Sequence, residues 1–461
     1  MVGVIDPSGE ENVPKLIKFG LYALQHRGQA NSGMVVSNLN ESATQEHKGM
    51  GLVSTVMEKP EFYALRGNVG VGYVGYEPKN VKNIQPFSAT NSKGSISIVM
   101  DGKIINTCEL RAKLSEHLFQ SDNDAELLMV AINKARGMTG SIEDAVMMVM
   151  RIVKGAYSAI IQTTNKMVAV RDPLGIKPLC MGHKGGAHVF ASESCALTTM
   201  KGVLERDVDP GEVVVVTKDG VVCHRENCPE READARHCAF EYVYRGNVNS
   251  KIDGVSVFQT RKNIGHKLGR LFLNKNLTAD AVAGVPDSGL IYAEGFAEET
   301  GIPYTHAISR NPYMGRTFIR PDANEKEITT SIKTSVIPWA VDGKKLAVVE
   351  DSIVTGNVAK SLIHTFKECG AEKVHFVSAS PPYINPCPFD HVRSDMTTKS
   401  LIAVGRSNEE IADIIGSDSV TLLPLDDFNN ELTNMSSLRK HCTTCFDGRH
   451  LFGGCCKEIN H

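Results

Sequence analysis

The chain lacks any long apolar run: across its 461 residues, no stretch approaches the ~18 apolar residues of a membrane-spanning helix. Its first residues lack the charged and apolar regions of a secretory signal peptide. Neither sign of charge dominates, because 50 Lys and Arg stand against 53 Asp and Glu. These absences predict a cytoplasmic protein, and they give no indication of binding to nucleic acid or to membranes.

The residues that are present describe an ordinary globular protein, 42% apolar and 22% charged, whose length suggests about two or three domains. Twelve cysteines are many for a cytosolic chain, in which free thiols or metal ligands are expected rather than disulfides. The spacing of Cys442 and Cys445 fits metal ligation. The Cys455-Cys456 pair is either a second site or, as we favour, a plain tail.

The most informative stretch covers residues 345–357. An apolar segment of strand character, Lys345–Val349, ends in Glu350 and Asp351, and a Thr-Gly loop then leads into a helical pattern over Val358–Cys369. A strand that delivers acids and a loop to a helix N-terminus is where α/β proteins bind phosphorylated ligands. The pattern predicts a ribose 5-phosphate site, with acids for the ribose hydroxyls or Mg²⁺ and loop amides for the phosphate. A surface turn with two incidental acids is the alternative, which the buried character of the strand disfavours.

The first 230 residues are predicted to form an α+β domain in which strands predominate and helices come in groups. Helical patterns occupy residues 10–27, Cys108–Leu118, Asp124–Arg136 and Ser141–Val153. Short turn signatures lie between them, and the most specific is Arg-Asp-Pro-Leu-Gly-Ile-Lys-Pro-Leu at Arg171–Leu179. In their order these signatures resemble the glutaminase domain of class II glutamine amidotransferases, an N-terminal-nucleophile αββα sandwich.

This first domain departs from that family at three functional positions. The family's nucleophilic cysteine, whose α-amino group acts as the base, is replaced by Val2. The arginine that holds the glutamine carboxylate is replaced by Gly75, and the asparagine that stabilises the oxyanion is replaced by Asp101. A carboxylate at this last position would repel a developing oxyanion. Three losses in one site predict a domain that keeps the fold but does not hydrolyse glutamine.

A polar stretch, Arg225–Arg236, is predicted to link this domain to a second one over residues 231–461. Strand and helix patterns alternate there, which predicts an α/β doubly wound parallel sheet with its site at the strand C-terminal ends. Strands are expected at Ala281–Val285, Tyr304–Ala307, Lys345–Val349, Lys373–Ser378 and Leu401–Ala403. Helices are expected at about Phe258–Leu273, Ser288–Thr300, Val358–Cys369 and Ser407–Ile415.

The loops of the second half complete the pattern. Val285–Gly289 closes one strand and opens a helix, which suits a pyrophosphate, and Arg310–Pro321 is a basic loop suited to closing over phosphates. Together with the first half, these segments resemble the glutamine phosphoribosylpyrophosphate (PRPP) amidotransferase family over nearly the whole chain. The resemblance implies PRPP and an amine donor as substrates, nucleotide effectors, Mg²⁺ and a homo-oligomer.

The resemblance also assigns roles to residues. Tyr313, Arg316 and Lys333 match the catalytic loop that closes on the substrate. Substrate-binding positions match Asp287, Ser288, Gly289, Glu350, Asp351, Ser352, Thr355 and Gly356, of which Ser288, Glu350 and Asp351 are also the Mg²⁺ positions. Asn357-Val358-Ala359 replaces a hydroxyl-rich run, and Arg245–Ser250 departs from the family at the expected domain interface.

One branch of the family carries a [4Fe–4S] cluster on four cysteines. The matching positions are Cys238, Cys387, Cys442 and Cys445, and all four are cysteine here. The resemblance therefore implies a cluster that ties the C-terminal tail to the second domain. Zn²⁺ on the same four thiolates is the alternative that spacing does not exclude.

Three functions are compatible with these features. The first is an amidophosphoribosyltransferase-type enzyme that uses ammonia from a source other than its own glutaminase site, as in the first step of purine nucleotide synthesis. The second is a phosphoribosyltransferase with a changed nucleophile in a specialised pathway. The third is a non-catalytic regulatory paralogue. The Asp287–Gly289 loop and the Glu350-Asp351 pair favour the first two.

Overall fold

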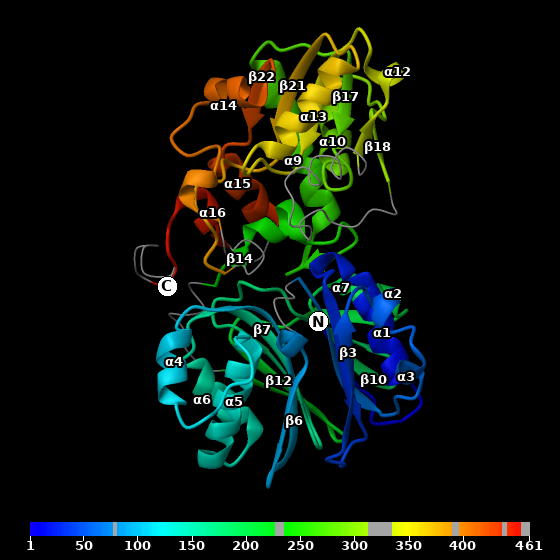
Figure 1. Cartoon of the computed structure of the whole chain (residues 1–461), viewed down its shortest axis with the longest axis vertical. Helices are drawn as coiled ribbons and strands as arrows, with labels where there is room; N and C mark the ends of the chain where they lie inside the picture. The colour runs from blue at the N-terminus through cyan, green and yellow to red at the C-terminus, as the bar shows by residue number, and fades with distance from the viewer. Residues whose placement is uncertain (77–80, 226–234, 312–333, 390–395, 436–439, 453–461) are drawn as a thin grey trace.

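The computed structural model describes residues 1–76, 81–225, 235–311, 334–389, 396–435 and 440–452 (Figure 1). Two parts are stacked along the long axis of the molecule, with the N-terminal half at one end and the parallel sheet of the second half at the other. The predicted boundary at residue 230 lies outside the described residues. Within the part of the chain that is described, no helix has the length and apolar character needed to cross a membrane.

The first half contains two antiparallel sheets that lie face to face. The seven-stranded sheet has the order β11-β9-β10-β1-β4-β2-β3. Its strands are β1 (Val2–Ile5), β2 (Asn31–Ser37), β3 (Thr44–Met50), β4 (Val69–Gly75), β9 (Cys180–Lys184), β10 (Ala187–Ala191) and β11 (Val203–Asp207). The six-stranded sheet has the order β13-β12-β8-β7-β6-β5. Its strands are β5 (Phe87–Asn91), β6 (Gly94–Ile104), β7 (Gly155–Thr163), β8 (Met167–Arg171), β12 (Glu212–Thr217) and β13 (Gly220–Arg225).

Helices cover the outer face of each sheet. The first sheet packs on α1 (Val13–Ala23), α2 (Val53–Val56), α3 (Pro60–Tyr63) and α7 (Ser194–Thr199). The second packs on α4 (Thr107–Lys113), α5 (Asp124–Met138) and α6 (Ile142–Met150). Between the sheets, Ile5, Val35 and Val71 meet Ile160 and Val214 in one buried cluster, because alternate side chains of a strand point to opposite faces. The predicted αββα sandwich is confirmed.

The second half is built around a parallel sheet with the order β17-β20-β21-β22. Its strands are β17 (Ala281–Gly284), β20 (Lys345–Glu350), β21 (Lys373–Ser378) and β22 (Ser419–Leu422). One apolar cluster joins the sheet to α9 (Val257–Asn274), α10 (Leu290–Thr300) and α15 (Leu425–Met435), and another joins it to α13 (Asn357–Glu368) and α14 (Asn408–Ile415). Helices on both faces confirm the doubly wound arrangement.

Two strand predictions for this half were wrong. Residues Leu401–Ala403 form a turn, and the fourth strand is β22 instead. Their apolar side chains are buried without sheet pairing: Ile402 donates its amide to the carbonyl oxygen of Val354 at 2.9 Å, beneath the loop after β20. The segment predicted as a strand at Tyr304–Ala307 makes only a single bridge, from Tyr304 to Val282.

Shorter elements complete the described chain. They are η1 (Gln25–Arg27), η2 (Val81–Asn83), β14 (His237–Cys238), the π-helical turn η3 (Glu241–Arg245), β15 (Lys251–Ile252), β16 (Val255–Ser256), β18 (Ile308–Arg310), β19 (Thr334–Val336), α12 (Pro338–Val341), η5 (Thr398–Ser400), β23 (His441–Cys442) and α16 (Thr444–Asp447). Strand β14 pairs in parallel with β23, so the start of the second half lies beside its last described segment.

Candidate functional site

The acids at the end of β20 lie beside the loop that follows β17. These two strands are parallel neighbours, so their C-terminal ends share one edge of the sheet. Asp351 is buried, and its two carboxylate oxygens accept hydrogen bonds from the hydroxyls of Ser288 and Ser352. Burial, together with the charge of Asp351, raises the pKa of Glu350 well above its usual range. The structure thus brings together the three side chains predicted to hold Mg²⁺.

The loop between β17 and α10 approaches the sheet too closely for a side chain at Gly289. A Cβ atom there would lie 2.6 Å from the carbonyl oxygen of Val349, so glycine is required for this approach. The preceding Asp287 forms an ion pair with Arg310. The Gly289 amide donates to the carbonyl oxygen of Val285 at 2.8 Å, and the loop leads into the 11-residue helix α10, whose N-terminus suits an anionic ligand.

The loop after Asp351 turns into α13 through Gly356. This residue has a φ of +78°, which side-chain-bearing residues rarely adopt, and an added Cβ atom would lie 2.4 Å from Cδ1 of Ile402. Thr355 beside it is exposed. The helix N-terminus therefore opens toward solvent at the same sheet edge as the acids. The predicted catalytic residues Tyr313, Arg316 and Lys333 lie outside the described residues.

Of the three altered positions of the first half, the structure brings two to one cavity. Val2 is fully buried in β1, between Ala191 and Gly72 of the neighbouring strands. Gly75 and Asp101 line a cavity of about 560 Å³, to which Val2 does not contribute. A Cβ atom at Gly75 would lie 2.6 Å from Oδ1 of Asn31, so a longer side chain there requires Asn31 to move.

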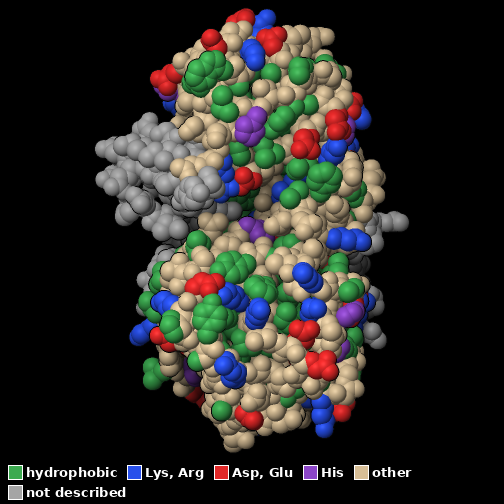
Figure 2. Space-filling model, turned by 90° about the vertical axis from the view of Figure 1, so that its right-hand side faces the viewer, with side chains coloured by type: hydrophobic (Ala, Val, Ile, Leu, Met, Phe, Trp, Pro, Cys, Tyr) green, Lys and Arg blue, Asp and Glu red, His purple; other side chains and the backbone are tan. Residues whose placement is uncertain are grey.

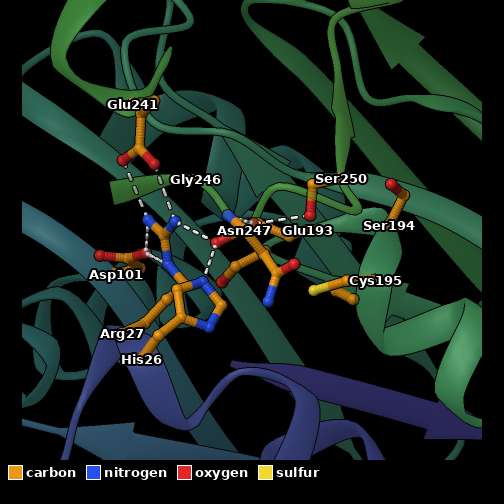
Figure 3. A network of polar contacts seen from close by, with 12 residues as sticks. His26, Arg27, Asp101, Glu193, Ser194, Cys195, Glu241, Gly246, Asn247 and Ser250 are labelled. Atoms are coloured by element: carbon orange, nitrogen blue, oxygen red, sulfur yellow. Dashed lines mark hydrogen bonds and ion pairs between the residues drawn. The ribbon is translucent and has the colours of Figure 1, made fainter. Parts of the chain in front are cut away.

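Asp101 is held by Arg27 in a network of buried charges (Figure 3). The Arg27 guanidinium donates to Oδ2 of Asp101 at 2.8 Å, to Glu193 at 2.7 Å and to Glu241 at 2.8 Å. Burial raises the pKa of the Asp101 carboxyl, but the positive charges of Arg27 and Lys177 outweigh this and hold that pKa well below its usual range. The carboxylate is therefore ionised and neutralised by its partner.

Glu193 connects this network to the second half. Its Oε2 accepts hydrogen bonds from the backbone amide of Asn247 and the hydroxyl of Ser250, both at 2.7 Å. Its Oε1 contacts Nε2 of His26 at 2.7 Å as well as Arg27. Sequence patterns did not predict that His26, Arg27 and Glu193 meet. The departure predicted at Arg245–Ser250 supplies two of these contacts.

A second buried ion pair crosses the same junction. Arg171, from the Arg-Asp-Pro segment, donates to both carboxylate oxygens of Asp253, at 2.5 and 2.8 Å. His237 contacts the same carboxylate at 2.7 Å. The Arg171–Asp253 and Arg27–Glu241 pairs join residues 82 and 214 positions apart, so the two halves are held together by desolvated charge pairs.

The four cysteines predicted to hold a cluster converge near the junction. Cys238 and Cys442 are register partners in the β14–β23 pair. Burial raises the pKa of the Cys445 thiol, and the neighbouring Cys387, Cys238 and Cys442 raise it further. All four are free thiols, and thiolates are the donor type that [4Fe–4S] clusters and structural Zn²⁺ take. Among the described residues, no group of three or more His, Cys, Asp or Glu side chains already has metal-binding geometry.

The first half, with its two facing sheets, is an N-terminal-nucleophile-type amidotransferase sandwich. It is joined to a phosphoribosyltransferase-type α/β domain that carries the acids at its sheet edge, and this combination defines the class of protein. Residues 78–199 match the glutamine amidotransferase domain family. The chain is 35% identical over 457 residues to the amidophosphoribosyltransferase of Methanocaldococcus jannaschii, covering 95% of this chain and 94% of that one, and 34% identical to the Bacillus subtilis enzyme of the same name, covering 97% and 93%. The chain therefore belongs to the amidophosphoribosyltransferase family.

Solved structures agree with this assignment. The glutamine PRPP amidotransferase of Bacillus subtilis, complexed with ADP and GMP, superposes with a TM-score of 0.88 at 32% identity and covers 98% of this chain and 96% of its own. A second match, described as the allosteric regulatory enzyme of purine biosynthesis, has the same score and identity and covers 98% of this chain. The whole chain thus has the family's two-part architecture.

Proposed function

We propose that the chain transfers ammonia to C1 of PRPP with release of pyrophosphate, the first step of purine nucleotide synthesis. The observation that carries this proposal is the meeting of Ser288 with Asp351 at the sheet edge, in a chain that matches amidophosphoribosyltransferases from end to end. The other two hypotheses, a changed nucleophile or a non-catalytic paralogue, have no comparable support, because the full-length relatives share one name.

Different residues of the site would bind different parts of PRPP. Glu350 and Asp351 would accept hydrogen bonds from the ribose hydroxyls, the amides of Asp287 and Ser288 would hold the pyrophosphate, and the loop Ser352–Gly356 would hold the 5-phosphate. Mg²⁺, held by Ser288, Glu350 and Asp351, would neutralise charge on the leaving pyrophosphate. The chain's own residues then fix the angle between the incoming amine and the departing group.

Catalysis would also depend on the loop between Arg310 and Pro321. Tyr313 and Arg316 belong to this loop, and Lys333 follows it. All three would close over PRPP and exclude water while C1 carries positive charge. Arg310 pairs with Asp287 of the pyrophosphate loop, so the start of this segment is already anchored beside the substrate position.

We also propose that the first half does not hydrolyse glutamine. Hydrolysis needs a nucleophile, and the buried Val2 side chain has none. It needs an oxyanion donor, but Asp101 is an ionised acceptor, and Arg27 already donates to its Oδ2. Ammonia would therefore reach the transferase site from solution or from a partner protein.

The four converging cysteines would hold a [4Fe–4S] cluster with a structural role. They come from the start of the second half, from the loop after β21 and from the last described segment. A cluster bonded to all of them would cross-link these three segments. Nucleotide effectors and assembly of several copies follow from the family resemblance and are proposed on that basis.

One assay tests the transferase and glutaminase proposals separately. Purified protein is mixed with PRPP and Mg²⁺, with either ammonium chloride at raised pH or glutamine, and both pyrophosphate and glutamate are measured. We expect pyrophosphate only with ammonium, and no glutamate from glutamine. The Asp351→Asn variant serves as the matched control and should lose about 10²-fold in kcat/KM for PRPP.

The outcomes separate the hypotheses. Glutamate release from glutamine would overturn the loss of glutaminase activity while leaving the transferase intact. Failure to release pyrophosphate with ammonium or any other amine would overturn the transferase and support the regulatory paralogue.

A further inference from the structure

Two buried histidines lie side by side in the β14–β23 pair. His237 and His441 are register partners in this parallel pairing, so their side chains project to the same side. Their ring centroids are 5.7 Å apart, and the ring planes are tilted by 59°. The next residues, Cys238 and Cys442, project to the opposite side, because successive side chains of a strand alternate. The two imidazoles therefore form a pair that is separate from the thiols.

One nitrogen of each ring lacks the hydrogen bond that a buried polar atom needs. Other histidine side chains of this protein reach the surface, as Figure 2 shows, and water can bond to their ring nitrogens there. His237 and His441 are only 1% and 8% exposed, and the Nε2 atom of each is buried without a hydrogen-bond partner among the described residues. An unpaired buried polar atom is destabilising. Two of them on neighbouring side chains point to a ligand that accepts both lone pairs.

The other nitrogen of His237 is held in the way that metal-binding histidines are held. Its Nδ1 contacts Oδ2 of Asp253 at 2.7 Å and the hydroxyl of Tyr242 at 3.2 Å. In metal sites a carboxylate commonly accepts the proton of one ring nitrogen, which fixes the ring and leaves the lone pair of the other nitrogen for the metal. Asp253 is itself fixed by two hydrogen bonds from Arg171. His237 therefore already has the supporting contact of a metal ligand.

The spacing of the rings suits one ion between them. Two imidazoles bound to one Zn²⁺ through Zn–N bonds of ~2.0–2.1 Å hold their centroids about 5–6 Å apart, which includes the observed 5.7 Å. Because no hydrogen bond holds Nε2 of His441 among the described residues, its ring can turn about its last torsion, which is broad for histidine. No third His, Cys, Asp or Glu ligand joins the pair in the part of the chain that the structure describes, so water would complete a tetrahedral shell.

We propose that His237 and His441 bind one Zn²⁺-like ion through their Nε2 atoms. Imidazole nitrogen suits Zn²⁺ and its neighbours in the first transition row, whereas Mg²⁺ and Ca²⁺ prefer oxygen ligands. The ion would join β14 to β23 and, through Asp253 and Arg171, would tie both strands to the first half. Its role is structural, it is distinct from any metal on the four cysteines, and it does not depend on transferase activity.

The test is titration of the full-length protein with Zn²⁺, followed by calorimetry and by elemental analysis. His441→Phe keeps an aromatic ring beside Tyr242 but removes the nitrogen, and His237→Asn keeps a donor for Asp253 but removes Nε2. Wild type should bind one zinc ion more than either variant, whatever metal the four cysteines hold. His364→Gln, at an exposed histidine of α13, is the control and should bind as much zinc as wild type does.

X-ray absorption at the zinc edge and thermal unfolding distinguish this site from the thiols. The zinc that wild type binds in excess of His441→Phe should have ligands at ~2.0–2.1 Å, typical of Zn–N, and none at ~2.3 Å, typical of Zn–S. Added zinc should raise the unfolding midpoint of wild type more than that of His441→Phe, because only wild type gains the bound ion. Equal zinc content in wild type and both variants, sulfur ligands around the additional zinc, or equal shifts of the midpoint would each overturn the proposal.

Discussion

Arg27 donates from both Nε and Nη2 to a single oxygen of Asp101, at 3.1 and 2.8 Å. The resemblance implies an oxyanion-stabilising asparagine at this position, and in the structure the acid found there is the counter-ion of a buried arginine. The same guanidinium reaches Glu241 of the second half at 2.8 Å. A position predicted to be merely degenerate thus takes part in holding the two halves together.

Removing this carboxylate should destabilise the protein. Asp101→Asn leaves Arg27 with Glu193 and Glu241 as partners, so we expect a loss of about 1–3 kcal/mol rather than the larger cost of an orphaned buried charge. Urea denaturation at pH 7 measures the difference. Glu109→Gln, which breaks an exposed pair with Lys113, is the control and should change nothing measurable. An unchanged midpoint for Asp101→Asn would show that the pair does not contribute to stability.

The effect of that substitution should depend on pH. Burial raises the pKa of Asp101, but Arg27 and Lys177 together hold it well below the value of about 3.9 expected in the unfolded chain. For an acid whose folded pKa is depressed, the stabilisation is complete above the unfolded pKa and is lost as the pH falls toward the folded one.

Wild type and Asp101→Asn should therefore differ most near pH 7 and converge as the pH falls below about 4. Urea midpoints of both proteins across this range provide the measurement. A difference that stays constant with pH would mean that the carboxylate's charge is not what stabilises the fold.

Gly356 should tolerate no side chain. Gly356 and Gly343 both have positive φ values, +78° and +67°, so alanine at either position carries the left-handed backbone cost of about 1–2 kcal/mol. Only at Gly356 does the new Cβ atom collide, with Ile402, whereas Gly343 faces open space. Gly356→Ala should lose a further ~1–3 kcal/mol of stability and raise the KM for PRPP. Equal losses at both positions would mean that the loop can shift without cost.

The cysteines give a prediction about metal content. Protein purified without oxygen should be brown, with broad absorbance near ~400 nm, and Cys445→Ser should lose both colour and iron. Cys180→Ser, at a buried thiol that is not one of the four, should keep both. Colourless wild-type protein containing zinc would replace the cluster with a Zn²⁺ site.

The sequence predicted the layers well, and it placed the acids that end one strand near the loop that ends its neighbour, because such local patterns are visible in the chain. The apolar strand Lys345–Val349 followed by two acids specifies its own place in a parallel sheet, and the structure brings Asp351 to Ser288 as expected. Leu401–Ala403 could not be predicted in the same way. An apolar triplet that is buried under a loop has the same composition as a short buried strand, and only the lack of a pairing strand distinguishes the loop segment from the strand.

The charge network lay beyond prediction for a different reason. Arg27 and Glu241 are separated by 214 positions, and no periodicity relates them. A weak signal did exist: Arg27 and Glu193 are charged residues close to the ends of predominantly apolar segments. Pairing them required the tertiary fold.

The parallel pairing of β14 with β23 can form only after both strands have been synthesised. Residue 238 leaves the ribosome roughly two hundred residues before its partner Cys442. The N-terminal sandwich is complete by β13, so it can fold while the rest is still being translated, and Glu241 and Asp253 can then dock on it. The four thiols, by contrast, meet only once Cys445 has emerged. Any metal centre they hold must therefore be inserted as one of the last steps of maturation, on a largely folded chain.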